Sequence, residues 1–114
     1  MTCGIYRIYH KGTGKSYIGQ SHNVEGRIRG HLKYLRNNTH VNIHLQRAFN
    51  LHGESSFEAQ IVEVCEPSEL TEKEQFWIDT ALYYAGVYNL ALIAGPGRKG
   101  VKASLETRQK QSKA

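Results

Sequence analysis

Two tyrosines near the start of the chain are placed where their phenols could handle protons together. Tyr6 and Tyr17 each belong to a short run of β-branched and aromatic residues, and ten residues separate them. The stretch 10–14 between the runs contains two glycines and favours a hairpin loop. An even number of loop residues would put both tyrosines on one face as diagonal neighbours, and an odd number would put them on opposite faces. Adjacent phenols could serve proton transfer, although paired tyrosines on a hairpin are more often packing residues.

A basic pair follows the second tyrosine at helical spacing. Arg27 and His31 are four residues apart, so on a helix they lie one above the other. We expect this helix to be capped by Ser21 or Asn23 and to run to about residue 36. Its apolar positions recur at helical spacing, namely Val24, Ile28, Leu32 and Leu35. The basic pair borders this apolar stripe, where the planar fork of an arginine suits a phosphate; a surface charge and a boundary histidine are the simpler interpretations of either residue alone.

A carboxylate lies on the apolar stripe of a later helix. We expect this helix to begin at Pro67, with Ser68 as its cap, and to end near residues 85–86. Its apolar positions are Leu70, Trp77, Ile78 and Ala81. Glu74 falls four residues after the first of these and four before the third, so it faces the core. An isolated buried charge is very costly, so the carboxylate must be paired, protonated or bound to a metal; a boundary glutamate paired with an arginine is an equally good interpretation.

The rest of the pattern predicts one more helix and one more strand. Val41, Leu45, Ala48 and Phe49 mark a helix that Gly53 would stop. Residues 57–65 alternate and then become β-branched, which predicts a third strand with one buried face.

Size and composition indicate one small domain. The chain has 114 residues, of which 39% are hydrophobic and 22% charged, an ordinary globular composition. It has no apolar run long enough to span a membrane and no secretory leader. Cys3 and Cys65 form neither a metal pattern nor a disulfide framework, and the six histidines match no standard zinc spacing. We therefore expect a reduced, cytoplasmic setting and no membrane partner.

The positive charge is concentrated at the end of the chain. Residues 1–94 contain nine Lys or Arg and nine Asp or Glu, so the whole net charge of +5 belongs to residues 95–114. The basic residues of this tail are Arg98, Lys99, Lys102, Arg108, Lys110 and Lys113. A neutral body with a basic tail is typical of a protein that meets a polyanion, although a solvated terminus explains the charge about as well.

Several of these motifs together resemble the signature of the GIY-YIG nucleases. Both tripeptides, Gly4-Ile5-Tyr6 and Tyr17-Ile18-Gly19, are intact and in order. An arginine and a histidine follow the second tripeptide as in the family's helix, and residues 74–78 are similar to the segment whose glutamate binds a divalent metal. Residues 40–53 are similar to the homing-endonuclease branch, and an asparagine after a tyrosine at 88–89 is similar to the final motif. The resemblance covers residues 4–90 and is nearest to the catalytic domain of phage intron-encoded homing endonucleases.

The resemblance implies a fold and a division of the chain. The fold would be a small α/β domain of the α+β type, a three-stranded antiparallel sheet flanked by helices. Residues 1–94 would be the catalytic domain. Residues 95–114 would be a basic flexible linker or the start of a DNA-binding module, in a piece of a longer protein or in a natural minimal form.

The resemblance also implies a reaction, the hydrolysis of a DNA phosphodiester with one Mg²⁺ or Mn²⁺ ion. The implied catalytic residues are Tyr6, Tyr17, Arg27, His31, His40, Glu74 and Asn89. Glu74 would hold the metal, and Arg27 would stabilise charge on the phosphate. A tyrosine base would need help, since a free phenol has a pKa of about 10, and the residues leave open which tyrosine, or His31, it is.

The implied partner is double-stranded DNA, bound by a monomer. The DNA-binding residues would be Arg27 and, in the tail, Arg98, Lys99, Lys102, Arg108 and Lys110. Two alternatives remain from the sequence. One is a structure-specific repair nuclease or a restriction nuclease of the same family, and the other is a non-catalytic DNA-binding protein that keeps the fold.

Overall fold

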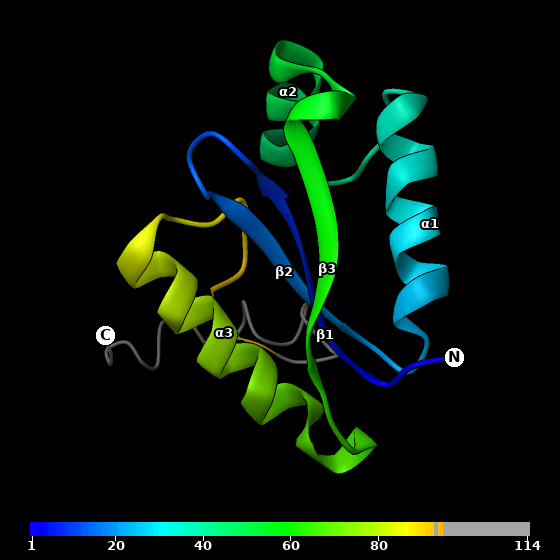
Figure 1. The fold of residues 1–114 in the computed structure, drawn as a ribbon, viewed down its shortest axis with the longest axis vertical. Coiled ribbons are helices and arrows are strands. Elements are labelled where there is room, and N and C mark those ends of the chain that lie inside the picture. Colours follow the sequence, from blue (N-terminus) through cyan, green and yellow to red (C-terminus); the bar gives the residue numbers. More distant parts are fainter. Residues whose placement is uncertain (93, 95–114) are drawn as a thin grey trace.

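A three-stranded antiparallel sheet forms the centre of the computed structural model, which describes residues 1–92 and 94 (Figure 1). The strands are β1 (Gly4–His10), β2 (Ser16–Ser21) and β3 (Phe57–Val64), in the spatial order β2-β1-β3. The helices are α1 (Val24–Arg36), α2 (Ile43–His52) and α3 (Leu70–Tyr84), with single 3₁₀ turns at Glu54–Ser56 and Pro67–Glu69. This is the predicted fold class. The predictions made for the basic residues of the tail lie outside the described residues.

The first hairpin has the even-length loop that would put Tyr6 and Tyr17 on the same face of the sheet. His10 donates its backbone N–H to Lys15 O, so the loop between the paired positions has an even number of residues. Tyr6 consequently lies opposite Gly19, and Ile8 lies opposite Tyr17. Because side chains alternate along a strand, the two tyrosines project from the same face of the sheet.

Two hydrophobic clusters cover the two faces of the sheet. On the face that carries the tyrosines, Ile8 and Phe57 pack against Leu35 of α1 and against Leu45 and Phe49 of α2. On the opposite face, residues of β1 and β2 pack against α3, and the buried members are Ile5, Ile18, Leu70, Ile78 and Ala94. Since β2 is an edge strand, the space beside it is bordered by α1 on one face of the sheet and by α3 on the other.

The helix starts are set by short polar side chains. Asn23 Oδ1 accepts the backbone N–H of Gly26 at 3.1 Å and caps α1, as one of the two predicted caps. Asn42 caps α2 in the same way, and Gly53, with φ of 87°, ends it. The prediction that Val41 lies on the buried face of this helix was wrong, because the helix begins after Asn42 and Val41 is 94% exposed.

The cap predicted for the last helix was also wrong. Pro67 opens a 3₁₀ turn that Glu66 caps in a reciprocal pair with Glu69, and α3 itself begins only at Leu70, so Ser68 lies within the turn and caps neither. Glu66 N–H donates to Glu69 Oε1 at 3.0 Å. Two glutamates at this spacing satisfy the free backbone N–H groups of the turn that leads into α3. No helix in the described part of the chain is long and apolar enough to cross a membrane.

Candidate active site

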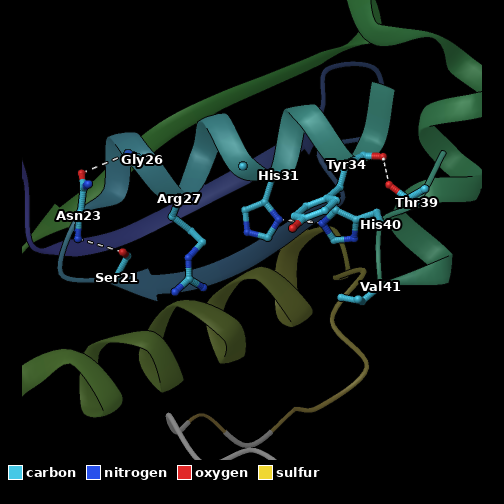
Figure 2. A pocket seen from close by; sticks show the side chains of 10 residues that line it. Ser21, Asn23, Gly26, Arg27, His31, Tyr34, Thr39, His40 and Val41 are labelled. Carbon is cyan, nitrogen blue, oxygen red and sulfur yellow. Dashed lines mark hydrogen bonds between the residues drawn. The ribbon is translucent and has the colours of Figure 1, made fainter. Parts of the chain in front are cut away.

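A groove of about 670 Å³ runs along α1 and reaches the loop before α2 (Figure 2). It is lined by Ser21, Asn23, Gly26, Arg27, Gly30, His31, Tyr34, Thr39, His40 and Val41. The two glycines of α1 belong to this wall, and a side chain at Gly30 would meet nothing within 4 Å. Three of the predicted site residues, Arg27, His31 and His40, therefore share one groove.

The phenol of Tyr6 lies beneath this groove and over Gly19. Tyr6 is 1% exposed. A Cβ at position 19 would come within 2.4 Å of both Tyr6 Cζ and its Oη, so only glycine fits opposite the ring. Tyr6, which ends the first tripeptide, thus explains why the second tripeptide ends in Gly19. The absence of a side chain at position 19 lets the phenol of the central strand extend across the edge strand.

A chain of hydrogen bonds begins at this phenol. Tyr6 Oη and His31 Nε2 are 2.6 Å apart, and His31 Nδ1 and His40 Nε2 are 2.7 Å apart. His40 Nδ1 accepts the backbone N–H of Asn42 at 2.9 Å. Figure 2 shows the two imidazoles side by side in the groove, with the bond between them drawn.

The backbone amide at the end of the chain determines the direction of every bond in it. An amide N–H can only donate, so His40 Nδ1 carries no proton, and a neutral His40 carries its proton on Nε2. That proton is donated to His31 Nδ1, which leaves the His31 proton on Nε2, facing Tyr6. Tyr6 Oη therefore accepts a hydrogen bond from His31, and its own hydroxyl proton points elsewhere.

The pKa values of the three groups agree with this arrangement. Burial, together with the neighbouring His40 and Arg27, lowers the pKa of His31 to about 4. Burial also lowers the pKa of His40, so both imidazoles are neutral at pH 7. Burial raises the pKa of Tyr6, the Tyr17 phenol adds to the rise, and the charge of Arg27 opposes it.

Tyr17 lies beside the same imidazoles but is only half-buried. Its ring centroid is 5.2 Å from that of His31 and 6.1 Å from that of His40, in edge-on contacts. Of the two signature phenols, Tyr17 is the one with the greater access to solvent.

Two opposite charges act on this cluster from the two faces of the sheet. Arg27 is exposed on α1, and in Figure 2 its guanidinium extends away from that helix toward the side of α3. Glu74 of α3 is 0% exposed, and its Oε1 accepts a hydrogen bond from Gln20 Nε2 at 2.5 Å. Both charges perturb the pKa of Tyr6, Arg27 lowering it and Glu74 raising it. The phenol, the arginine and the carboxylate are thus brought together around the edge of β2.

Asn89 lies behind the site and holds the edge strand. Its Oδ1 accepts the backbone N–H of Ile18 at 2.9 Å, and its Nδ2 donates to Ile18 O at 2.8 Å. Nearby, the backbone of Ser16 is paired with Gly86 O and with the N–H of Tyr88. Asn89 thereby fixes the residue between Tyr17 and Gly19, and contacts the site only through the backbone.

The donor set can be tested against the expected metal. Within the described residues no group of three His, Cys, Asp or Glu is arranged to hold an ion. A single buried carboxylate held in place by a neutral amide is a hard oxygen donor, and it fits Mg²⁺, an ion that keeps several of its waters and takes one or two carboxylates. The same residues do not fit zinc, which takes four protein ligands in structural sites and three in catalytic ones.

Three polar residues that support the site were missed by the sequence analysis. They are Gln20, which holds Glu74; Asn42, whose backbone orients His40; and Gln46, whose Oε1 accepts the His40 backbone N–H at 3.0 Å. A signal existed for Gln20, because it shares a strand face with Ile18, which packs against α3. Polar residues on apolar faces of two adjacent elements predict a contact between them.

Comparison with known proteins identifies the family. The profile of the GIY-YIG catalytic domain matches residues 2–85, so the chain belongs to this family. The chain is 38% identical over 93 residues to intron-associated endonuclease 1 of Enterobacteria phage T4, a match that covers 80% of this chain and 38% of that protein. The chain therefore spans well under half the length of this relative.

Two solved structures are similar to the whole body of the molecule. A mutant of the catalytic domain of intron endonuclease I-TevI is 36% identical, with a TM-score of 0.72, and the match covers 85% of this chain and all of that one. A second structure of the catalytic domain of homing endonuclease I-TevI gives a TM-score of 0.71 at 36% identity, covering 78% of this chain and 98% of that one. These matches confirm the three-stranded fold predicted from the signature.

Proposed function

We propose that the chain is the catalytic part of a DNA endonuclease of the homing type, which hydrolyses phosphodiester bonds with one divalent metal ion. The observation that carries this proposal is a cation and a buried carboxylate at one edge strand: Arg27 lines the groove beside β2, and Glu74, which is 0% exposed, is held by Gln20 of β2. A binding module needs cations for phosphates but has no use for a fully buried carboxylate near them.

Glu74 would hold the metal, Mg²⁺ or Mn²⁺, and Gln20 would keep its carboxylate oriented. When bound, such an ion polarises the phosphate and stabilises the leaving oxygen. Arg27 would bind two oxygens of the scissile phosphate and stabilise the charge that builds up on them, since a guanidinium is always protonated and forms two parallel hydrogen bonds.

Tyr17, once its own phenol proton has been transferred away, is the better candidate for the group that takes the proton of the attacking water. A general base must come within hydrogen-bond reach of the water, and Tyr17 is half-buried whereas Tyr6 is enclosed. Tyr6, with its oxygen accepting from His31, would orient its own hydroxyl proton toward the neighbouring site. His40, which accepts the Asn42 N–H, would donate to His31, and His31 would donate to Tyr6, so that the Tyr6 hydroxyl has one orientation. Asn89 would keep β2 in register.

The substrate we propose is double-stranded DNA, cut by a monomer in the cytoplasm of a host cell. Residues 1–94 would supply the chemistry, and residues 95–114 would link it to a DNA-binding region of a longer protein. The T4 relative, more than twice as long as its matched part, is consistent with such a region.

A plasmid-nicking assay with Mg²⁺ tests the proposal, comparing the native chain with Glu74→Ala and Arg27→Ala. Each variant removes one of the two charges at the site, so we expect each to lower the nicking rate at least about a hundredfold, the effect of removing one group that stabilises transition-state charge. Arg29→Ala, an exposed arginine on α1 outside the groove, is the matched control and should cut at the native rate.

Two outcomes would contradict the proposal. Nicking that survives both substitutions would mean that the site is elsewhere. A folded chain that binds DNA without cutting it, even when fused to a foreign DNA-binding domain that raises its local concentration, would establish a binding protein that has kept the fold.

A further inference from the structure

A second groove, of about 570 Å³, runs along one face of α2, which lines it from His44 to His52. The hairpin loop, α2 and the end of α3 form its walls, and they lie at one end of the sheet in Figure 1. It is lined by His10, Thr13, Lys15, His44, Arg47, Ala48, Leu51, His52, Ala85 and Tyr88. None of the proposed catalytic residues is among them.

The charges that line this groove are all of one sign. Lys15 and Arg47 are cations, three histidines accompany them, and none of these lining residues, all in the described part of the chain, is acidic. Residues 1–94 as a whole carry equal numbers of acidic and basic residues, so the neutral body has a locally positive surface here. A positively charged groove without carboxylates attracts phosphates.

The groove is held open by contacts among its own walls. Lys15 Nζ lies 5.0 Å above the ring of Tyr88, which keeps the ammonium in place at the floor. His10 is 8% exposed, its Nδ1 accepts the Thr13 backbone N–H at 3.1 Å, and its ring packs on His52 at 4.2 Å. His10 is thus part of the wall, while the charges of Lys15 and Arg47 are available to a ligand.

The second groove is connected to the catalytic groove through Asn42. The catalytic groove ends at His40 and Val41, and the second one begins at His44. Between them, Asn42 donates its backbone N–H to His40 and its side-chain amide to Tyr88 O at 2.9 Å. Asn42 therefore joins a residue that lines the first groove, His40, to one that lines the second, Tyr88.

We infer that the second groove binds phosphates of the substrate DNA at a distance from the bond that is cut. This inference rests on the proposed function for its ligand, a duplex with its backbone phosphates, and adds a second contact that positions the duplex on the domain. The two cations supply charge without reading bases, so the contact contributes affinity and orientation and no sequence preference.

Equilibrium binding of a short DNA duplex by the full chain tests the inference, in a Glu74→Ala background so that no DNA is cut. The test variant is Lys15→Gln/Arg47→Gln. Its matched control is Lys11→Gln/Arg29→Gln, which removes one lysine and one arginine from exposed positions that line neither groove. Affinity is measured by fluorescence anisotropy between about 0.05 and 0.3 M salt, where each lost phosphate contact lowers the slope of log K against log salt by about 0.9.

We expect the test variant to lose about 1.8 from the magnitude of the slope and to bind about tenfold to twentyfold more weakly at about 0.2 M salt, whereas the control keeps the native slope. A Lys15→Arg/Arg47→Lys variant keeps both charges and should bind like the native chain, which separates the charge from the packing on Tyr88. Equal losses in test and control, or an unchanged slope in the test variant, would overturn the inference.

The nicking assay separates failure of this inference from failure of the proposed function. If the native chain cuts DNA and the test variant keeps the native salt slope, the proposed nuclease function stands and the second DNA contact is refuted. If binding depends steeply on salt and on Lys15 and Arg47 but no DNA is cut, the second DNA contact stands and the proposed nuclease function is refuted. A native chain that does not bind duplex DNA at all would overturn the inference whatever the nicking assay shows.

Discussion

His31 makes two hydrogen bonds that only its neutral form can satisfy together. Its Nδ1 must accept from His40, because His40 donates in that direction under the control of the Asn42 amide. A proton added to Nδ1 would place two N–H groups opposite each other inside the site. The folded chain therefore resists protonation at His31, whereas the unfolded chain takes up that proton readily.

The pKa of His31, lowered to about 4, predicts how stability depends on pH. Below pH 6.5 the unfolded chain binds a proton that the folded chain does not, so the free energy of unfolding falls as the pH drops toward 4. Between pH 7 and pH 5 the loss from His31 is about 2 kcal/mol, and His40 adds to it in the same direction. Urea unfolding at both values measures it, with His31→Gln expected to show a smaller difference than the native chain.

The exposed His22 supplies the control for this prediction. His22→Gln should keep the native pH dependence, since His22 lies at the surface and takes no part in the hydrogen bonds of His31 and His40. The carboxylates whose pKa is lowered, such as Glu63 beside Trp77, lose their stabilisation mainly below pH 4.5, outside the measured window. If His31→Gln and the native chain lose the same free energy, the buried neutral imidazole does not control the acid response.

Gln20 is expected to stabilise the fold through the carboxylate that it holds. Gln20→Ala removes a hydrogen bond to a fully buried charged group, and such bonds contribute about 1.5 to 3 kcal/mol. Thermal unfolding measures the loss. Gln60→Ala is the matched control, because Gln60 also bonds a charged side chain: its Oε1 accepts from Arg7 Nε at 2.6 Å in a half-exposed position away from the site. A loss in the control as large as that for Gln20 would mean that burial of Glu74 does not matter.

At the scale of elements, two glycines on neighbouring segments should respond to alanine with opposite signs. Gly19→Ala would push a methyl group into the enclosed phenol of Tyr6, and overpacking of this kind destabilises by about 1 to 3 kcal/mol. Gly30→Ala meets nothing within 4 Å and replaces a poor helix former in α1, so it should stabilise by about 1 kcal/mol. Urea unfolding of both variants decides the prediction, and a Gly19→Ala variant as stable as the native chain would refute the close contact with Tyr6.

The elements also show what the sequence could and could not predict. The alternation in the first hairpin and the helical spacing around Glu74 are local, so the shared face of Tyr6 and Tyr17 and the burial of Glu74 followed from them. The start of α2 was misplaced because Val41 fits the apolar spacing as well as a helical residue would, while the capping bond of Asn42 depends on geometry. The partners of His40 could not be predicted, since each bond has a backbone N–H on one side, that of Asn42 in one and that of His40 in the other, which no side-chain pattern records.

At the scale of the whole molecule, the basic tail and the two grooves should share the affinity for DNA. Deleting residues 95–114 removes six basic residues and one acidic one, which is the entire net charge of +5. We expect the shortened chain to bind a duplex more weakly, with a shallower dependence on salt, and to keep Mg²⁺-dependent nicking at low salt because the site itself is untouched. Anisotropy and nicking on the same preparations test both parts.

The same deletion can contradict the assignment of the grooves. If the shortened chain shows no binding even at low salt, all affinity resides in the tail and neither groove contributes measurably. If it binds but cannot nick, some residue beyond 94 takes part in the chemistry, and the catalytic domain is longer than residues 1–94.

The hydrogen bonds between Asn89 and Ile18 also affect whether copies of the chain can associate through β2. The unpaired N–H and C=O groups of an edge strand invite another chain to add a strand there, which is a common route to aggregation. On the outer side of β2 the groups of Ile18 are occupied by the Asn89 side chain, and those of Ser16 by the backbone of Gly86 and Tyr88. The strand that carries Tyr17 therefore offers no template at these positions to a second copy, and self-association is not expected to block the edge beside the candidate active site.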